Sequence, residues 1–330
     1  MRRWLRAWAL AGCGSFALCG CGARSAAPPL VLERTIPLGA VSGRIDHLAI
    51  DPARRQLFVA QLGDGSVAAV DLADGRLLSR IAGLDEPQGV GYLPAQDEFV
   101  VATGGDGMLR FYRAADLKPV GALKLGEDAD DVRVDAQTGR VLVGYGEALA
   151  VVDPAARTLI RKIALPAHPE GFQAKGDLAF VNLPRAGALA EVDLAQGREL
   201  ARWPNPGPHF NFPLAFDADA GLIAAVYRLP ARLVLFRAVT GRAAQNLDTC
   251  GDADDAFFDS VRRRLYVICG SGAVDVFERR PAGYARTGRI ATRDGARTGL
   301  FAASLDRLYV AARARGSEPA AILVYRPNGP

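Results

Sequence analysis

Acidic side chains recur along this chain at a spacing that would gather them into one site. Two nearly identical peptides, "EDADDVRVD" at 127–135 and "GDADDAFFD" at 251–259, belong to a series of seven related segments. Successive aligned positions are 42, 42, 40, 42, 42 and 43 residues apart. The aligned residues are Asp46, Gln88, Asp130, Glu170, Phe212, Asp254 and Arg297.

Cation binding is the chemistry that these residue types suggest. Asp46, Asp130, Glu170 and Asp254 would supply carboxylate oxygens, which Ca²⁺ and Mg²⁺ prefer. Asn211 would add an amide oxygen, while His47 and His168 leave room for a transition metal. We therefore expect a funnel that binds a divalent cation or a polar ligand, lined by Asp46, His47, Gln88, Asp130, Glu170, Asn211, Asp254 and Arg297.

The positions beside the aligned residues are also acidic. Together with the positions two before and one after, the aligned column contains nine carboxylates and two arginines, Arg44 and Arg297. All three histidines, His47, His168 and His209, fall in the same segments. Carboxylates crowded in this way raise one another's pKa unless a cation or hydrogen bonds offset the repulsion.

A purely structural interpretation stays open for several of these residues. An aspartate in a turn before a strand caps backbone amides, which is one role for Asp131 and Asp255. Arg297 in the last segment could pair with Asp46 in the first, if the two segments are neighbours in a closed ring.

The elements around each segment predict the fold. After the opening strand comes a polar turn, then a second apolar strand such as "QLFVA" or "RLYVI", a Gly-rich turn, and third and fourth strands. Four short strands in each unit of about 40 residues, with no long helical period, are typical of a β-propeller blade. The first strand of each blade lines the central channel, so the acidic segments converge at one mouth.

The last unit predicts how the ring closes. It ends at Pro330 with three strands, and "PLVLERTIPL" at 29–38 matches the missing fourth strand. Pairing the two ends would cover both exposed sheet edges. We therefore expect an all-β fold, a single seven-bladed β-propeller of four-stranded blades over 30–330, closed by an N-terminal strand that completes the last blade.

The blades resemble a known family. The "RLYV" strands, the "GSVAAVDLADGR" turn and the blade length are similar to the YVTN repeat of YncE-like bacterial β-propellers, although no literal "YVTN" is present. The resemblance covers nearly the whole mature chain. It implies an exported or surface-associated propeller and specifies no activity.

The N-terminus predicts export. "MRRWLRAWALAGCGSFALCGC" has a basic start and a short apolar stretch, and it resembles a bacterial lipoprotein signal. We expect a signal peptide at 1–20, lipidation of Cys21 and a linker at 21–29, with an unlipidated secreted form as the alternative. Removal of three arginines lowers the formal net charge from +4 to +1, so the basic balance gives no reason to expect a nucleic-acid partner. The expected location is the periplasm or cell envelope, with membrane attachment through the lipid only.

Two cysteines remain for a disulfide. Cys250 precedes the first strand of the sixth blade and Cys269 ends the second, so antiparallel pairing would bring Cys269 opposite Ala253. A bridge between Cys250 and Cys269 suits an oxidising compartment, and two buried thiols are the alternative.

Two functions remain open at this stage. No CxxCH, GxSxG, phosphate-loop or HExxH motif is present. We expect a monomeric scaffold that binds a small polar ligand or a protein. The alternative is a metal-dependent hydrolase resembling gluconolactonase-like propellers, with the metal at the channel mouth. Those enzymes usually have six blades, whereas seven are counted here.

Overall fold

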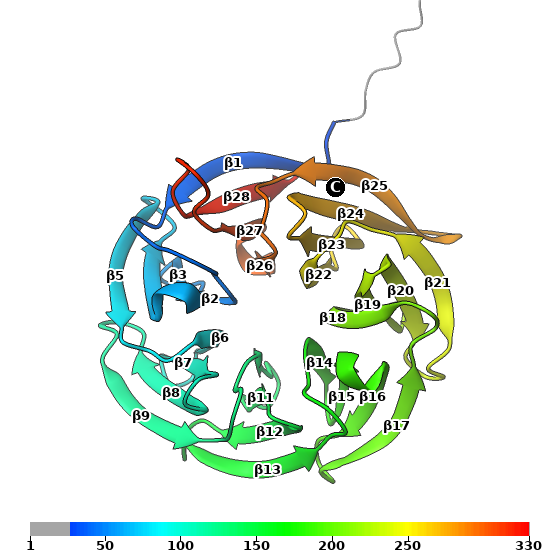
Figure 1. Ribbon diagram of the computed structural model, residues 1–330, viewed down its shortest axis with the longest axis horizontal. Coiled ribbons are helices and arrows are strands. Elements are labelled where there is room, and N and C mark those ends of the chain that lie inside the picture. The colour runs from blue at the N-terminus through cyan, green and yellow to red at the C-terminus, as the bar shows by residue number, and fades with distance from the viewer. Residues whose placement is uncertain (1–26, 330) are drawn as a thin grey trace, which may run out of the picture.

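Seven four-stranded antiparallel sheets surround a common axis in the computed structural model, which describes residues 27–329 (Figure 1). The fold is the predicted seven-bladed β-propeller. Each blade runs outward from an opening strand beside the axis to a fourth strand at the perimeter (Figure 1). The expected signal peptide at 1–20 and the expected lipidation site Cys21 lie outside the described residues.

The blades follow one another in the chain. Blade 1 contains β2 (Leu48–Asp51), β3 (Gln56–Gln61), β4 (Ser66–Asp71) and β5 (Arg76–Ala82). Blade 2 contains β6 (Pro87–Leu93), β7 (Glu98–Thr103), β8 (Met108–Arg113) and β9 (Pro119–Lys124). Blade 3 contains β10 (Val132–Val134), β11 (Val141–Tyr145), β12 (Ala148–Asp153) and β13 (Thr158–Ala164). Blade 4 contains β14 (Phe172–Lys175), β15 (Leu178–Leu183), β16 (Ala188–Asp193) and β17 (Arg198–Pro204).

The remaining blades complete the ring. Blade 5 contains β18 (His209–Asp217), β19 (Leu222–Leu229), β20 (Ala231–Arg237) and β21 (Ala243–Asp248). Blade 6 contains β22 (Ala253–Asp259), β23 (Arg264–Cys269), β24 (Ala273–Arg280) and β25 (Gly283–Ala291). Blade 7 contains β26 (Thr298–Ala302), β27 (Arg307–Ala312), β28 (Ala321–Pro327) and β1 (Leu30–Pro37).

The first strand of the chain closes the ring as expected. β1 pairs antiparallel with β28, from Leu30 opposite Pro327 to Pro37 opposite Ala321. The pairing ties the two ends of the chain into one sheet, so neither β1 nor β28 leaves its inner edge unpaired.

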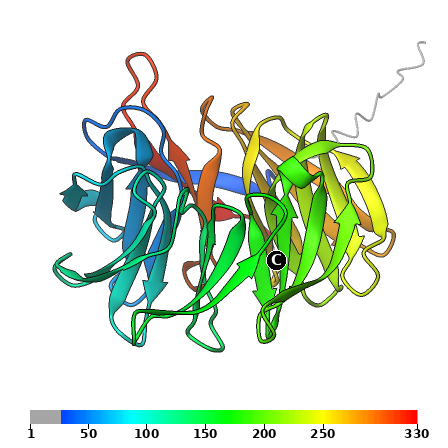
Figure 2. The same ribbon diagram turned by 60° about the horizontal axis from the view of Figure 1, so that its bottom comes forward.

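The core lies between neighbouring blades. Second and third strands such as β3 are buried along their whole length, because each of their faces packs against an adjacent blade. Fourth strands such as β5 are largely exposed. The turned view in Figure 2 shows a thick disc with loops on both faces. No helix among residues 27–329 is long and apolar enough to cross a membrane.

Blade 6 contains a disulfide. Cys250 and Cys269 are bonded, with their Cα atoms 5.8 Å apart. Ala253 pairs with Cys269 in the register expected from the sequence. The bridge therefore links the segment that opens β22 to the end of β23, next to the acidic peptide at 251–255.

Candidate functional site

A repeated β-bulge brings consecutive polar residues to the channel mouth. Asp46 donates its backbone N–H to the Ala60 carbonyl oxygen over 2.8 Å, and His47 accepts from the Ala60 N–H over 3.1 Å, so two residues oppose one. The same pattern sets Asp130 and Asp131 opposite Gly144. In a regular strand, successive side chains point to opposite faces. The bulge re-aims the extra side chain, which explains why adjacent acidic residues share one cavity.

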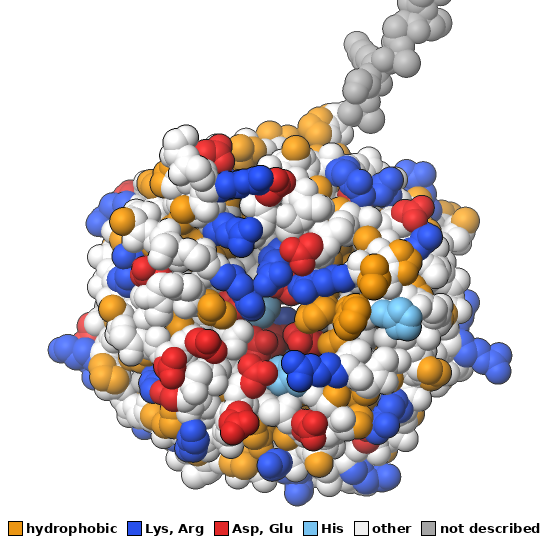
Figure 3. Space-filling model, in the orientation of Figure 1, with side chains coloured by type: hydrophobic (Ala, Val, Ile, Leu, Met, Phe, Trp, Pro, Cys, Tyr) orange, Lys and Arg blue, Asp and Glu red, His pale blue; other side chains and the backbone are white. Residues whose placement is uncertain are grey.

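These side chains line a cavity of about 210 Å³ at one mouth of the channel. Figure 3 shows that acidic side chains gather on one side of the central hollow and basic side chains on the other. The structure brings together seven of the predicted funnel residues: Asp46, His47, Gln88, Asp130, Glu170, Asp254 and Arg297.

Asn211 corrects the sequence prediction, because it is not part of this lining. Its side chain is fully buried between blades 4 and 5, where it donates to Asn182 Oδ1 over 2.8 Å and to the Ala188 carbonyl oxygen over 2.9 Å. Its own Oδ1 accepts from Asn205 over 3.1 Å. Asn211 therefore joins the two blades and does not face the funnel.

His47 forms the floor of the cavity with two aspartates. Its Nδ1 lies 3.4 Å from Asp255 Oδ2, and its Nε2 lies 4.0 Å from Asp131 Oδ1. Asp255 also accepts the Gly299 N–H of β26 over 2.9 Å, so its structural role is to join blade 6 to blade 7 rather than to cap the turn before its own strand. Burial alone would lower the pKa of His47, but Asp255 and Asp131 outweigh it and raise that pKa well above its usual value. The floor therefore places the His47 imidazole between two acidic side chains that favour its protonated form.

Below this floor the channel becomes apolar. A second cavity, of about 480 Å³, shares His47, Arg133 and Asp255 with the first and is otherwise lined largely by opening-strand residues such as Val90, Val132 and Leu300. Most charged groups of the channel therefore lie at one mouth.

Arginines neutralise two of the predicted cation ligands. Arg44 Nη2 lies 2.5 Å from Asp46 Oδ2. Arg297 Nε lies 2.8 Å from Asp254 Oδ2, and Arg228 also donates to Asp254. Arg297 therefore pairs with Asp254 of blade 6 rather than with Asp46, the partner that the structural interpretation suggested. The basic side of the mouth consists of these ion pairs.

The acidic side is organised around His168. Its Nδ1 lies 2.9 Å from the Gly146 carbonyl oxygen and 3.5 Å from Asp128 Oδ2, while its Nε2 lies 3.9 Å from Asp130 Oδ2. Burial opposes charge on His168, but Asp130 and Asp128 raise its pKa. Burial also opposes ionisation of Asp130, yet His168 and His47 together lower its pKa. The two histidines therefore favour the ionised form of Asp130.

Two other carboxyl groups titrate near neutral pH. Burial raises the pKa of Asp46 to about 7, and the charge of Asp130 adds to that shift while His47 opposes it. Burial and Asp130 likewise raise the pKa of Glu170 to about 7, against the opposing effect of His168. Carboxyl groups poised in this way, inside a cavity, are a recognised feature of functional sites.

Several polar atoms of this cavity lack a partner. Buried Asp46 Oδ1, Asp130 Oδ1 and Asp131 Oδ2 accept no hydrogen bond, and Arg44 Nε donates none, within the described part of the chain. An unsatisfied buried polar atom costs about 1–3 kcal/mol, and more when it is charged. Three of these four atoms are acceptors, so the groups that the cavity needs are mainly hydrogen-bond donors.

The predicted metal ligands are not gathered around a common point. No group of three or more His, Cys, Asp and Glu side chains within residues 27–329 is arranged to hold a metal ion. Asp46 and Asp254 face arginines, as described above, whereas Asp130 and Glu170 lie on the acidic side. A cationic guanidinium beside a carboxylate opposes the approach of a metal cation.

Sequence reasoning missed several residues of the lining. Arg228 lies near the end of β19, and its guanidinium carbon is 3.7 Å from the centre of the Phe212 ring, a cation–π contact. Arg133 is the second residue of β10, and Arg185 lies in the short turn Pro184–Ala186. Arg228 lies beyond the usual end of a second strand. The unusual length of the second strand in blade 5 was therefore the sequence feature that could have indicated it.

The rim includes residues in the left-handed backbone region. Glu86, Asp128, Phe210 and Asp252 stand at the same repeat position, with φ between 52° and 62°. Such angles are uncommon for residues other than glycine, and most costly for bulky ones. Phe210 nevertheless keeps its ring 47% exposed beside the mouth, and Leu229, which pairs with His209, is 60% exposed. Backbone strain of this kind occurs at ligand sites, and in this chain it also occurs in turns between strands, as at Asp97 and Asp306.

Comparison with known proteins identifies the fold alone. No protein-family model matches the sequence, and no curated protein matches it either. Among solved structures, the chain is similar to one titled Kuenenia stuttgartiensis hydrazine synthase, with a TM-score of 0.72 and 15% sequence identity. The match covers 85% of this chain and 99% of that chain. At this identity the likeness establishes a shared propeller architecture, and no family is assigned to the chain.

Proposed function

We propose that this chain is an exported, lipid-anchored binding protein of the YVTN and YncE-like type, and that its charged mouth binds a small ligand with an ammonium group. The observation that carries the proposal is the set of three buried carboxylate oxygens without a donor, on Asp46, Asp130 and Asp131. A ligand ammonium group has three N–H donors and the charge that these oxygens require.

The size and charge of the cavity narrow the ligand class. About 210 Å³ suits a small molecule and excludes a folded domain from the interior. The arginines Arg44, Arg228 and Arg297 lie across from the acidic side, so a zwitterion or an amino sugar would find complementary groups on both sides. Phe212 and Pro213 line the cavity, where they offer an apolar surface to the rest of the ligand.

The hydrolase alternative gains less support from these residues. A metal that polarises a carbonyl needs an open coordination sphere of several protein ligands. Here Asp46 and Asp254 each lie against an arginine. The ligand proposal uses the same carboxylates with no change in these ion pairs.

Calorimetric titration of the purified chain at pH 8 tests the proposal. The probes are putrescine and glucosamine, each beside its N-acetylated form, which lacks one ammonium group. We expect binding of at least one amine, with a Kd at least tenfold weaker for the acetylated form. Asp46→Asn combined with Glu170→Gln should weaken binding at least tenfold. His209→Gln is the matched control, because this third histidine does not line the cavity.

Two results would contradict the proposal. The first is that none of the amines binds, or that the double variant binds as tightly as the wild type. The second is that Ca²⁺ binds, the double variant loses that binding, and no amine binds. The second result would replace the ammonium site by the metal site of the alternative.

A further inference from the structure

Two of the seven junctions between neighbouring blades are joined by an arginine clasp on the turn that follows the opening strand. Arg54 of blade 1 donates to both Asp97 carboxylate oxygens of blade 2, over 2.5 and 2.7 Å. Arg262 of blade 6 does the same to Asp306 of blade 7, over 2.6 and 2.9 Å. In each case the arginine is the third residue after the opening strand, and the acceptor is the fourth residue in the next blade.

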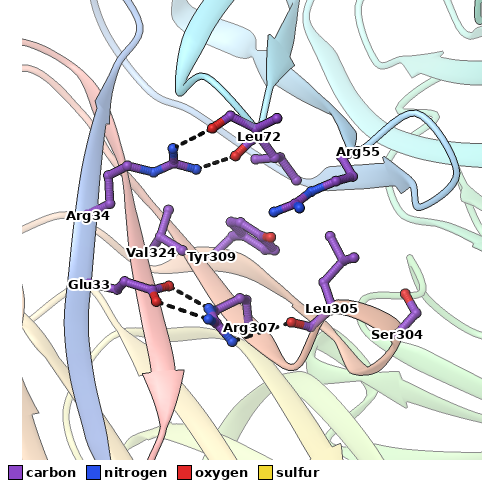
Figure 4. Close-up of a pocket in the computed structure, with 10 residues that line it drawn as sticks. Glu33, Arg34, Arg55, Leu72, Ser304, Leu305, Arg307, Tyr309 and Val324 are labelled. Atoms are coloured by element: carbon purple, nitrogen blue, oxygen red, sulfur yellow. Dashed lines mark hydrogen bonds and ion pairs between the residues drawn. The ribbon is translucent and has the colours of Figure 1, made fainter.

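The junction of blade 7 with blade 1 lacks the clasp, as four other junctions do, but it differs from them in carrying an arginine at the acceptor position beside a cavity. The third residue after β26 is Leu305, and the fourth residue after β2 is Arg55. Leu305 has no donor, and Arg55 replaces the carboxylate that would accept one. A cavity of about 570 Å³ lies at this junction, and both residues line it (Figure 4). The substitution of both partners therefore leaves an open, basic pocket where the two clasped junctions have an ion pair.

The neighbouring charged groups of the pocket are held in place. Arg34 of β1 donates over 3.1 Å to the Ala73 carbonyl oxygen and also to that of Leu72. Arg307 of β27 pairs with Glu33 through two nitrogens, over 2.5 and 2.9 Å. The Glu33 carboxylate is thereby neutralised, and its pKa is lowered by the hydrogen bond from Arg307, although burial opposes that shift.

Arg55 is the guanidinium without a partner. Its side chain makes no hydrogen bond and no ion pair with the residues from 27 to 329, and Figure 4 shows it pointing toward Tyr309 inside the pocket. With Arg34 fixed and Glu33 paired, the pocket keeps an excess of positive charge. Tyr309 and Ser304 add hydroxyl groups to the lining.

We propose that this junction binds the phosphate group of a phosphate ester, with Arg55 as the principal donor. The planar guanidinium forms two parallel hydrogen bonds to a phosphate, as it does to a carboxylate in the two clasps. Arg34 adds a fixed positive charge, and the apolar Leu72, Leu305 and Val324 contact the organic part of the ester. The pocket lies at the outer seam of the ring and is separate from the charged mouth, so the two proposals are independent.

The first test is calorimetric titration of the purified chain with inorganic phosphate and with glycerol 3-phosphate at low ionic strength. We expect glycerol 3-phosphate to bind, and Arg55→Gln to weaken that binding at least tenfold. Arg263→Gln is the matched control, because Arg263 occupies the same turn position in blade 6 and does not line this pocket. Failure of both ions to bind, or equal binding by Arg55→Gln and wild type, would overturn the proposal.

A second variant rebuilds the clasp. Leu305→Arg combined with Arg55→Asp would place the donor and the acceptor as in the two clasped junctions. We expect this variant to lose phosphate binding without a fall in Tm, because the new ion pair fills the pocket. A variant that keeps the wild-type Kd would show that the phosphate binds elsewhere.

Sedimentation with lipid vesicles identifies the source of the phosphate. The vesicles contain phosphatidylcholine alone or with phosphatidylglycerol. Binding to the anionic vesicles that Arg55→Gln reduces and glycerol 3-phosphate competes away would support a lipid headgroup. Binding of glycerol 3-phosphate without vesicle binding would support a soluble ester.

Discussion

Replacing Asp46 by asparagine should stabilise the protein at alkaline pH while it damages the proposed site. The Asp46 side chain is 1% exposed, and its Oδ1 has no hydrogen-bond donor within the described residues. Asparagine has nearly the same shape and no charge. The substitution therefore removes the cost of holding an anion in a buried position, and it leaves the volume of the cavity almost unchanged.

The magnitude and the sign follow from the pKa of Asp46. Burial raises this pKa from an ordinary value of 3.8 to about 7. Because the folded chain binds the proton more tightly than the unfolded chain, wild-type stability is greatest at low pH and falls as the pH rises from about 4 to about 7. A pKa shift of about three units corresponds to about 4 kcal/mol of folding stability, which is lost above pH 7. This pKa already includes the attraction of Arg44, so the loss of that ion pair adds no separate cost.

The expected net gain for Asp46→Asn is therefore about 4 kcal/mol at pH 8 and about 1 kcal/mol at pH 4.5. For a chain of this length, the gain at pH 8 corresponds to a rise in Tm on the order of 5 °C. Differential scanning calorimetry of both proteins at pH 4.5, 6, 7 and 8, without any amine, measures it. Glu86→Gln is the control, because this exposed carboxylate at the rim should change Tm at no pH.

A gain in Tm that is equal at all four pH values would refute the reasoning, because it would not come from ionisation. A loss at pH 8 would refute it more directly. That result would mean that the Asp46 carboxylate is stabilised by Arg44 and His47 by more than burial costs.

Two further predictions concern the ring and its attachment. Asp217 of β18 accepts from Arg279 over 2.8 Å and from the Tyr284 hydroxyl over 2.6 Å, and it is 2% exposed, so Asp217→Asn should lower the free energy of unfolding by about 3–5 kcal/mol in urea titrations. An effect below about 1 kcal/mol would contradict a structural role for this buried pair. For the N-terminus, cells fed radiolabelled palmitate should label the wild-type chain and not Cys21→Ala, and an unlabelled wild type would favour the secreted, unlipidated form.

The ring was predictable from the sequence because its determinants are periodic. Every blade repeats the same order of turn, apolar strand and Gly-rich turn, and the missing last strand had one counterpart, 29–38. Because β3 and β11 are buried on both faces, register within a blade follows from the short turns that join successive strands rather than from burial. The seam between the ends could therefore be placed before any contact was known.

The side-chain partners at the mouth were not predictable in the same way. Alignment identified the positions that converge, but a bulge makes the aligned residue and its successor share a cavity, and alignment does not show which arginine reaches which carboxylate. Arg228 enters from a second strand, outside the aligned columns. Asn211, within an aligned segment, turns away to join Asn182. Both outcomes depend on the backbone conformation of β18 and β19 in blade 5.

Position 89 must be glycine, for a reason that the structure shows and the sequence alone does not. A Cβ atom on Gly89 would lie 2.0 Å from the Asp130 carbonyl oxygen and 2.6 Å from Val132 Cγ2. Only a residue without a side chain lets β6 approach the opening segment of blade 3 this closely. The contact that holds Asp130 in the cavity thus depends on a residue of the neighbouring blade.

The distribution of unsatisfied atoms separates the mouth from the rest of the ring. Nine buried polar side-chain atoms lack a partner within residues 27–329, and four of them, on Arg44, Asp46, Asp130 and Asp131, line the one charged cavity. Elsewhere, buried charges such as Asp217 and Asp275 have arginine and hydroxyl partners. The other five atoms are spread over the ring, on Gln61, Arg80, Glu98, Arg157 and Thr292, so the mouth is the one place in the described chain where four such atoms gather. Natural proteins are less than optimally stable at functional sites, where a ligand supplies the missing hydrogen-bond partners.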